Sequence, residues 1–303
     1  MTYLKKFGLL LALLLAGSWL GASAQVVAAG TAEPDQPELD QPGDALVPPT
    51  SASDFTASQL DDVLAGSWRS EANRARDSWR HPKATLQFFG IQPDQTVIEI
   101  TPGGGWYAEL LAPLLHDNGH YIAAEQAPSS NSEARTDDSK LRRKFAADPA
   151  HFGNATIVSF DPKKPVFGAP ASADLVLTFR NVHNWVMADT APAMFKAFYA
   201  VLRPGGVLGV VDHRAADGAT LAAVKSSGYL PTAAVIKLAT DAGFKLDERS
   251  EINANPADDH DHPKGVWTLP PTLAGDTDRA KYQAVGESDR MTLRFVKPAA
   301  ATH

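Results

Sequence analysis

Between residues 97 and 250, short apolar runs alternate with stretches whose hydrophobic residues recur at helical spacing. The apolar runs predict strands at residues 97–100, 121–124, 156–159, 175–179 and 207–212, and the periodic stretches predict helices at 107–115, 140–147, 191–201 and 233–242. Strands that alternate with helices indicate a mostly parallel sheet with helices on both faces. The pattern therefore predicts an α/β fold with a Rossmann-like sheet.

The pattern changes at both ends of this alternation. Residues 54–90 carry helical signals without an intervening strand, which predicts a cap of extra N-terminal helices. After the last periodic stretch, residues 244–250 and 291–297 predict closing strands, which we expect to pair antiparallel at the C-terminal side of the sheet. A polar insertion, 253–289, separates them. All these segments belong to one predicted domain, residues 54–298.

The first residues have the features of a secretory signal peptide. Lys5 and Lys6 precede an apolar run that ends at Leu20, and small residues precede Gln25. We expect cleavage after residues 1–24 and export to the periplasm or cell envelope. The apolar run is too short for a spanning helix, so no stable membrane span is expected after cleavage. Retention of the segment as an N-terminal anchor is the alternative.

Composition narrows the classes of partner. Without Lys5 and Lys6 the chain has 26 basic and 35 acidic residues, a net charge of −9, and no basic stripe interleaved with aromatic residues. This balance argues against a nucleic-acid partner. The absence of cysteine excludes a disulfide and a lipid attachment through a thiol. Residues 25–53, rich in Pro and Ala, predict a disordered leader, and residues 299–303 form a short tail.

A glycine-rich turn gives the first indication of a binding site. The strand at 97–100 runs through residues 101–105, TPGGG, directly into a predicted helix. Glycines at such a turn allow a ligand to approach the backbone, and the free N–H groups of the helix face a polar or anionic group. Glu125 ends the next strand, at the distance of an acid that holds ribose hydroxyls. These features predict a nucleotide-type site, although a tight connection without a ligand is the alternative.

Polar residues follow two other predicted strands. The sequence FRNVHNW, residues 179–185, begins where the strand at 175–179 ends, and ligands in open parallel sheets bind beyond the carboxyl ends of strands. Arg180, Asn181 and His183 would supply a charge, an amide donor and a titratable base. A polar loop that caps the following helix is the alternative.

The next strand ends in Asp212, His213 and Arg214, which should lie near the same edge of the sheet. Asp212 would either orient His213 or pair with Arg214. An ordinary salt bridge at the strand end explains these residues equally well.

Two further groups are open to more than one interpretation. Asp77, Arg80 and His81 precede Pro82, a pattern typical of a solvated helix end. The family resemblance described below implies instead that they form a lid over the cofactor. Residues 258–262, DDHDH, are metal-ligating types, but five adjacent residues cannot all point at one ion. We expect no metal site there and instead expect the insertion to shape the mouth of the pocket.

The chain resembles the class I S-adenosylmethionine (SAM)-dependent methyltransferases. Glu99 and the turn that follows it are similar to the first motif of that family, an acidic residue that runs into GxGxG. Glu125 matches the acidic end of the second strand, and LRPGG at 202–206 is similar to the turn before the fifth. More narrowly, RHPKATLQFFG at 80–90, ITPGGGWYAELLAP and FRNVHNW resemble a group of predicted exported methyltransferases.

The resemblance implies a cofactor, a reaction and roles for particular residues. SAM would be the cofactor, and a methyl group would pass to an unidentified small-molecule or envelope acceptor. His183 or His213 would remove a proton from the acceptor, while Arg180 and Asn181 would position the acceptor or the methionine carboxylate. The implied cofactor-binding residues are Glu99, Thr101, Gly103, Gly104, Gly105, Glu125 and Phe179.

One departure from the family pattern concerns the turn itself. Thr101 stands where the family has its first glycine, and Pro102 follows it. Because Thr disfavours a positive φ and Pro lacks an N–H donor, we expect the turn not to reproduce the usual backbone. Two other functions stay open. An exported protein would meet little SAM, which favours a non-catalytic methyltransferase-like protein that binds another small ligand. The other is a nicotinamide-dependent dehydrogenase, which LRPGG and FRNVHNW disfavour.

Overall fold

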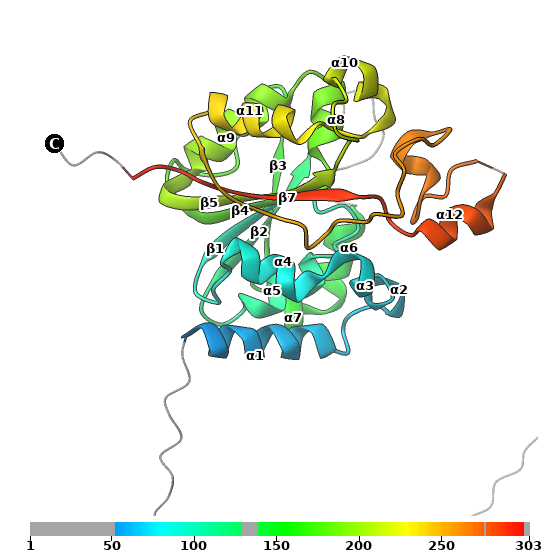
Figure 1. The fold of residues 1–303 in the computed structure, drawn as a ribbon. Helices are drawn as coiled ribbons and strands as arrows, with labels where there is room; N and C mark the ends of the chain where they lie inside the picture. The colour runs from blue at the N-terminus through cyan, green and yellow to red at the C-terminus, as the bar shows by residue number, and fades with distance from the viewer. Residues whose placement is uncertain (1–51, 129–138, 276, 300–303) are drawn as a thin grey trace, which may run out of the picture. The chain divides into compact units, whose positions relative to one another are not determined.

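The computed structural model describes residues 52–128, 139–275 and 277–299, and the strands in these ranges form one seven-stranded sheet (Figure 1). Its order is β3-β2-β1-β4-β5-β7-β6, with β1 to β5 parallel and β7 antiparallel to both β5 and β6. The strands are β1 (Thr96–Ile100), β2 (His120–Gln126), β3 (Thr156–Phe160), β4 (Ala173–Phe179), β5 (Leu202–His213), β6 (Lys245–Ser250) and β7 (Arg290–Val296). The predicted α/β fold with antiparallel closing strands is confirmed.

Helices cover both faces of the sheet (Figure 1). On one face lie α1 (Ala52–Ala65), α2 (Glu71–Arg74), α3 (Asp77–Arg80), α4 (Pro82–Phe89), α5 (Ala108–Leu114), α6 (Lys140–Ala147) and α7 (Pro149–Phe152). On the other lie α8 (Val182–Met187), α9 (Ala191–Val201), α10 (Leu221–Val224) and α11 (Thr232–Asp241). The insertion contributes α12 (Arg279–Val285). The first four helices form the N-terminal cap that the sequence predicted.

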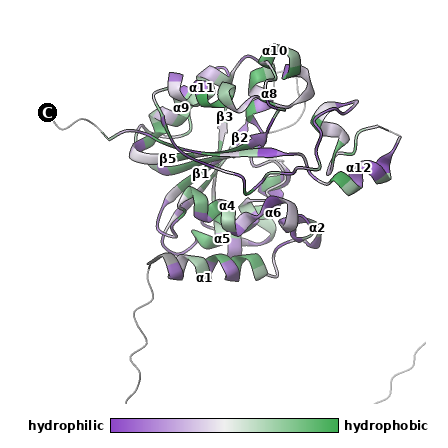
Figure 2. Cartoon of the chain, in the orientation of Figure 1, coloured by the Kyte–Doolittle hydropathy of each residue, from purple (hydrophilic) through white to green (hydrophobic). Residues whose placement is uncertain are grey.

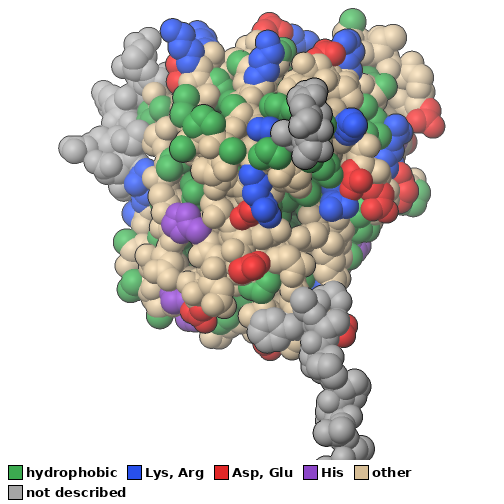
Figure 3. All heavy atoms as spheres, turned by 90° about the vertical axis from the view of Figure 1, so that its left-hand side faces the viewer, with side chains coloured by type: hydrophobic (Ala, Val, Ile, Leu, Met, Phe, Trp, Pro, Cys, Tyr) green, Lys and Arg blue, Asp and Glu red, His purple; other side chains and the backbone are tan. Residues whose placement is uncertain are grey.

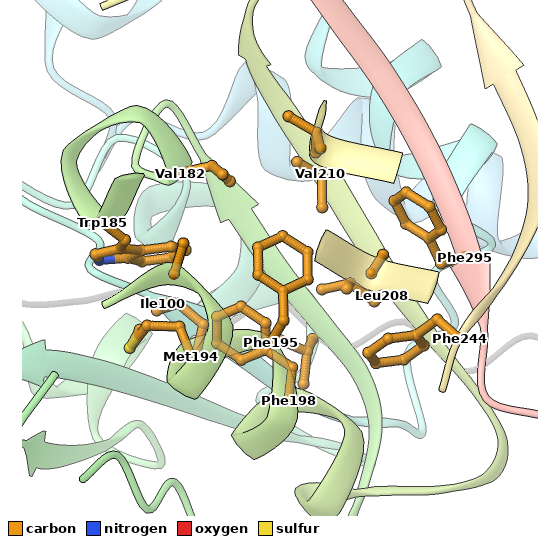
Figure 4. Packing of buried hydrophobic residues seen from close by; sticks show 14 of the residues in the cluster. Ile100, Val182, Trp185, Met194, Phe195, Phe198, Leu208, Val210, Phe244 and Phe295 are labelled. Atoms are coloured by element: carbon orange, nitrogen blue, oxygen red, sulfur yellow. The ribbon is translucent and has the colours of Figure 1, made fainter. Parts of the chain in front are cut away.

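Two hydrophobic clusters fill the space between the sheet and its helices. Successive strand residues point to opposite faces, so Val97 joins the cluster under α1, α4 and α5, whereas Ile98 joins the cluster under α8, α9 and α11. In the second cluster, Phe195 and Phe198 of α9 pack towards the sheet (Figure 4). Hydrophobic and hydrophilic residues accordingly share the flanking helices, as Figure 2 shows.

The structure departs from the sequence pattern where polar residues lie between buried ones. Residues 182–187 form α8, where the sequence pattern predicted no helix. Val182, Trp185 and Val186 recur at helical spacing and are buried, while the polar residues between them masked that periodicity. Strand β5 also begins earlier than predicted, because Leu202 pairs with Ala173 and draws LRPGG into the strand.

The predicted signal peptide, residues 1–24, lies outside the described residues, as do most of the predicted leader and the end of the tail. Helix α1 begins at Ala52, two residues inside the predicted leader. None of the helices in the described ranges is long and apolar enough to cross a membrane. Basic, acidic and hydrophobic side chains are interspersed on the face shown in Figure 3.

Truncation of Phe198 tests how the helix layer is held on the sheet. Its ring is buried and contacts those of Phe167, Trp185 and Phe195. We expect Phe198→Ala to lower the free energy of unfolding by about 3–5 kcal/mol, because it leaves a cavity in the core. Urea unfolding measures this loss, and Val166→Ala, at a side chain 71% exposed, should change stability by less than about 0.5 kcal/mol. Equal effects of the two substitutions would contradict this account of the core.

Candidate functional site

A cavity of about 270 Å³ lies at the carboxyl ends of β1 and β4. The strand order reverses between these two neighbours, and open α/β sheets bind ligands in the crevice at such a point. The cavity is lined by the cap, the glycine turn and the end of β4: Asn73, Arg76, Arg80, Glu99, Thr101, Pro102, Gly103, Gly104, Trp106, Tyr107, Phe179, Arg180 and Asn181. A more apolar cavity of about 320 Å³ lies in the helix layer of α8 to α11, away from the strand ends.

The glycine turn faces open space. A Cβ atom added at Gly103 or Gly104 would meet no atom within 4 Å, whereas one at Gly105 would collide with Leu141. Gly105 therefore packs against α6, while the other two glycines border the cavity. Within the described residues, the backbone N–H groups of Gly103 and Gly104 donate no hydrogen bond. The buried Thr101 Oγ1 atom has no hydrogen-bond partner there either.

Thr101 adopts the left-handed conformation that the sequence analysis disfavoured. Its φ is +54°, and its N–H donates to the Ala124 carbonyl at 2.8 Å. Thr101 thus does not avoid a positive φ, which was one reason given for an altered turn, while the altered turn itself stays a prediction. A β-branched residue in this region carries strain of about 1–3 kcal/mol, which the surrounding structure must offset.

Glu99 is a buried carboxyl group in the cavity wall, 3% exposed, and it accepts a hydrogen bond of 2.6 Å from the Tyr121 hydroxyl. Burial raises the pKa of Glu99 to about 7, although that hydrogen bond and the charge of Arg80 favour the ionised form. The carboxyl group is therefore close to half protonated at neutral pH.

Glu125 ends β2 as predicted, but it is not among the residues that line the cavity. Its carboxylate accepts a hydrogen bond of 3.0 Å from Ser139 Oγ and lies 3.5 Å from Arg142 Nε. Both partners stand at the start of α6, so Glu125 anchors that helix to the sheet. A ligand hydroxyl would have to share this carboxylate with Ser139.

The residues after β4 bind the backbone as well as border the cavity. Asn181 Nδ2 donates to the Ile100 carbonyl at 3.0 Å, which connects the ends of β1 and β4. Arg180 has a φ of +61° and donates its backbone N–H to Val211 at 2.7 Å. The Phe179 ring stacks on Tyr107 with centroids 3.5 Å apart. Asn181 therefore positions the two strand ends with its amide.

His183 and His213 lie together, but neither is among the residues that line the cavity. Asp212 accepts from His183 Nδ1 at 2.9 Å and from the His213 backbone N–H at 2.7 Å. Burial, together with the nearby positive charges, holds the pKa of His213 well below its usual value, so His213 is a weak base. Arg214 does not pair with Asp212, since it binds Asp289 and Glu251 instead.

The cap and the insertion meet at a group of arginines that the sequence analysis mostly missed. Arg80 borders the cavity, as a lid residue would, and so does Arg76. Asp77 does not; its carboxylate instead accepts two hydrogen bonds from the Arg69 guanidinium. Glu287, from the end of the insertion, pairs with Arg76 across 211 positions of sequence. No local sequence pattern predicts a contact between residues so far apart in the chain, although the charged residues before β7 are visible in the sequence.

Within the insertion, Asp258 is engaged by protein groups. It accepts from the Tyr229 hydroxyl at 2.8 Å, from His262 Nε2 at 2.8 Å and from the Asp289 backbone at 2.8 Å. These contacts join Asp258 to the end of the insertion, directly before β7, and to the segment before α11. Asp258, Asp259 and His262 also have ligand atoms close enough together to hold a metal ion, so the absence of a metal site there stays a prediction.

The chain shares its fold with solved proteins that include SAM-dependent methyltransferases. A SAM-dependent methyltransferase from Aquifex aeolicus matches with a TM-score of 0.50 and 13% identity over 80% of this chain and 98% of its own. The [4+2]-cyclase SpnF matches with a TM-score of 0.50 and 15% identity over 82% and 97%. No protein-family model and no curated protein matches the sequence. Identities this low show a shared fold, and the two names show that this fold serves more than one reaction.

The titration of Glu99 makes the free energy of unfolding depend on pH, and a substitution of Glu99 can measure its contribution. Its folded pKa, about 7, exceeds the ordinary value of 4.5, so between these pH values the folded chain holds a proton that the unfolded chain has lost. The free energy of unfolding therefore falls as pH rises through this range. The amide of Glu99→Gln stays uncharged, so its stability relative to the parent should rise by about 3 kcal/mol and then level off.

Urea unfolding of both proteins at about pH 5 and about pH 8 measures this difference, because other titrating groups cancel in the comparison. Glu248→Gln, at an exposed side chain of β6, is the matched control and should show no such rise. A constant difference between Glu99→Gln and the parent would show that Glu99 has an ordinary pKa.

Proposed function

We propose that this chain is a SAM-dependent methyltransferase. The observation that carries the proposal is the open glycine turn at the carboxyl end of β1, with unbonded N–H groups at Gly103 and Gly104 bordering the cavity. Such a turn suits the close approach of a nucleoside-bearing ligand. The shared fold of the Aquifex aeolicus methyltransferase supports the same reading.

The residues around the cavity fit the cofactor. The glycine turn and Phe179 would hold it, and Glu99 would face its positively charged groups. When bound, SAM supplies an activated methyl group for in-line transfer to a nucleophile. The protein aligns the acceptor and excludes water, which the buried cap residues favour. The role of His183 as a base stays a prediction, with Asp212 fixing its ring through Nδ1.

The second candidate function is the binding of a small ligand at the same site, without methyl transfer. Glu125 is already bonded by Ser139 and Arg142, and SpnF shows this fold in a cyclase. An exported binding protein with a different small ligand would fit both observations. Export itself is a proposal that depends on the sequence of residues 1–24.

Gly104→Ala tests the proposed cofactor site. The added methyl group meets no protein atom within 4 Å and projects into the open space beside the turn, so it should obstruct a ligand without disturbing the fold. In calorimetric titrations we expect the parent to bind S-adenosylhomocysteine with a Kd on the order of micromolar. The variant should bind at least about tenfold more weakly, which is about 1.4 kcal/mol.

The free energy of unfolding is the control for this variant. Gly104 has no positive φ, so alanine should leave stability unchanged or raise it by up to about 1 kcal/mol. Equal affinity of parent and variant would place the ligand elsewhere. No binding of SAM or S-adenosylhomocysteine to the parent at millimolar concentration would favour the binding-protein alternative.

A further inference from the structure

Positive charge exceeds negative charge around one end of the cavity. Arg76, Arg80, Arg180 and Arg290 all lie within 4 Å of Glu287, which is 2% exposed. The carboxyl group in the cavity wall, that of Glu99, is near half protonation at neutral pH. Four guanidinium groups therefore face fewer than two negative charges, in a chain whose overall charge is negative.

Glu287 does not satisfy all four arginines equally. Its two oxygens accept close hydrogen bonds from Arg76 Nε at 2.6 Å and from Arg290 Nη1 at 3.1 Å. Arg80 Nε is 3.4 Å away and Arg180 Nη1 is 3.9 Å away. Glu287 is thus occupied by Arg76 and Arg290, and Arg80 and Arg180 keep only long contacts with it.

These two arginines have hydrogen-bonding capacity left over, and both line the cavity. Arg80 is 3% exposed, its Nη2 has no partner, and its guanidinium lies over the Trp106 ring at 4.5 Å. Within the described ranges the Arg180 side chain makes no hydrogen bond to protein. Burial and the charge of Arg180 lower the pKa of Arg80 to about 9, as expected of neighbouring cations without enough counter-charge. A buried, unpaired charge is costly unless a ligand supplies its partner.

We propose that Arg80 and Arg180 bind an anionic group of the acceptor, either a carboxylate or a phosphate. The acceptor assignment rests on the proposed methyltransferase function. SAM carries an ammonium and a sulfonium group beside its single carboxylate, so it is a net cation and its binding leaves the excess of positive charge at the site in place. This charge balance favours an anion on the second substrate. Planar guanidinium groups suit both carboxylate and phosphate oxygens.

The test uses anions alone, on the full chain. Thermal unfolding is followed while inorganic phosphate or citrate is added, with chloride at matched ionic strength as the reference. The parent should show a rise in Tm that chloride does not reproduce. Arg180→Gln and Arg80→Gln should lose most of that rise. Arg249→Gln, at an exposed position of β6, is the matched control and should keep it.

The Tm of Arg180→Gln in chloride also shows whether Arg180 binds an anion or stabilises the fold. Removing a cation that makes no hydrogen bond to the described protein should leave Tm in chloride unchanged or higher, since its repulsion with Arg80 disappears. A clear fall in that Tm would assign Arg180 to the fold and overturn the proposal. So would the absence of an anion effect in the parent, or an equal effect in Arg180→Gln and Arg249→Gln.

Saturating S-adenosylhomocysteine distinguishes the two sources of a carboxylate. If phosphate still raises Tm in its presence, the arginines are available to the acceptor, as proposed. If S-adenosylhomocysteine abolishes the effect of phosphate on Tm, the arginines hold the cofactor's own carboxylate and the acceptor assignment is overturned. Failure of S-adenosylhomocysteine to bind at all would overturn the methyltransferase function, while the phosphate titration would still decide whether the arginines bind an anion.

Discussion

The hydrogen bond from Asn181 Nδ2 to the Ile100 carbonyl holds together the point on which the site depends. Strands β1 and β4 are neighbours, but the chain leaves them towards different parts of the fold, which opens the crevice between them. The Asn181 amide bridges that crevice at its base with a bond of 3.0 Å. The glycine turn on one side and Arg180 on the other are thereby fixed relative to each other.

Three residues with a strained backbone lie around this crevice. His81, Thr101 and Arg180 all have positive φ values; Thr101 and Arg180 border the cavity, and His81 directly follows Arg80, which also borders it. Each such residue costs on the order of 1–3 kcal/mol, which two large hydrophobic clusters on either side of the sheet can offset. Strain of this kind is common where side chains must point in a direction that an unstrained turn would not allow. Here it places a threonine hydroxyl and an arginine at the cavity.

Much of the sheet could be predicted because buried parallel strands are short apolar runs, as Val97–Ile100 and Leu175–Phe179 are. The glycine turn was predicted because its chemistry is local in sequence. Glu287 could not be, since its role comes from a contact with Arg76 that only the assembled fold creates. Nor could the sequence show that Glu125 is engaged by Ser139, because that bond depends on where α6 begins. Local chemistry was therefore readable, and the pairing of charges was not.

Glu287 lies late in the chain, so its ion pairs depend on the last part of the domain. It stands directly before β7, the strand that lies between β5 and β6 and joins them. During synthesis, a nascent chain that ends at residue 286 already contains Arg76, Arg80 and Arg180, but neither their carboxylate nor the strand that seats β6. The carboxylate that Arg76 and Arg290 share and the strand that joins β5 to β6 both lie in residues 287–296. A chain that terminates before them would therefore lack both.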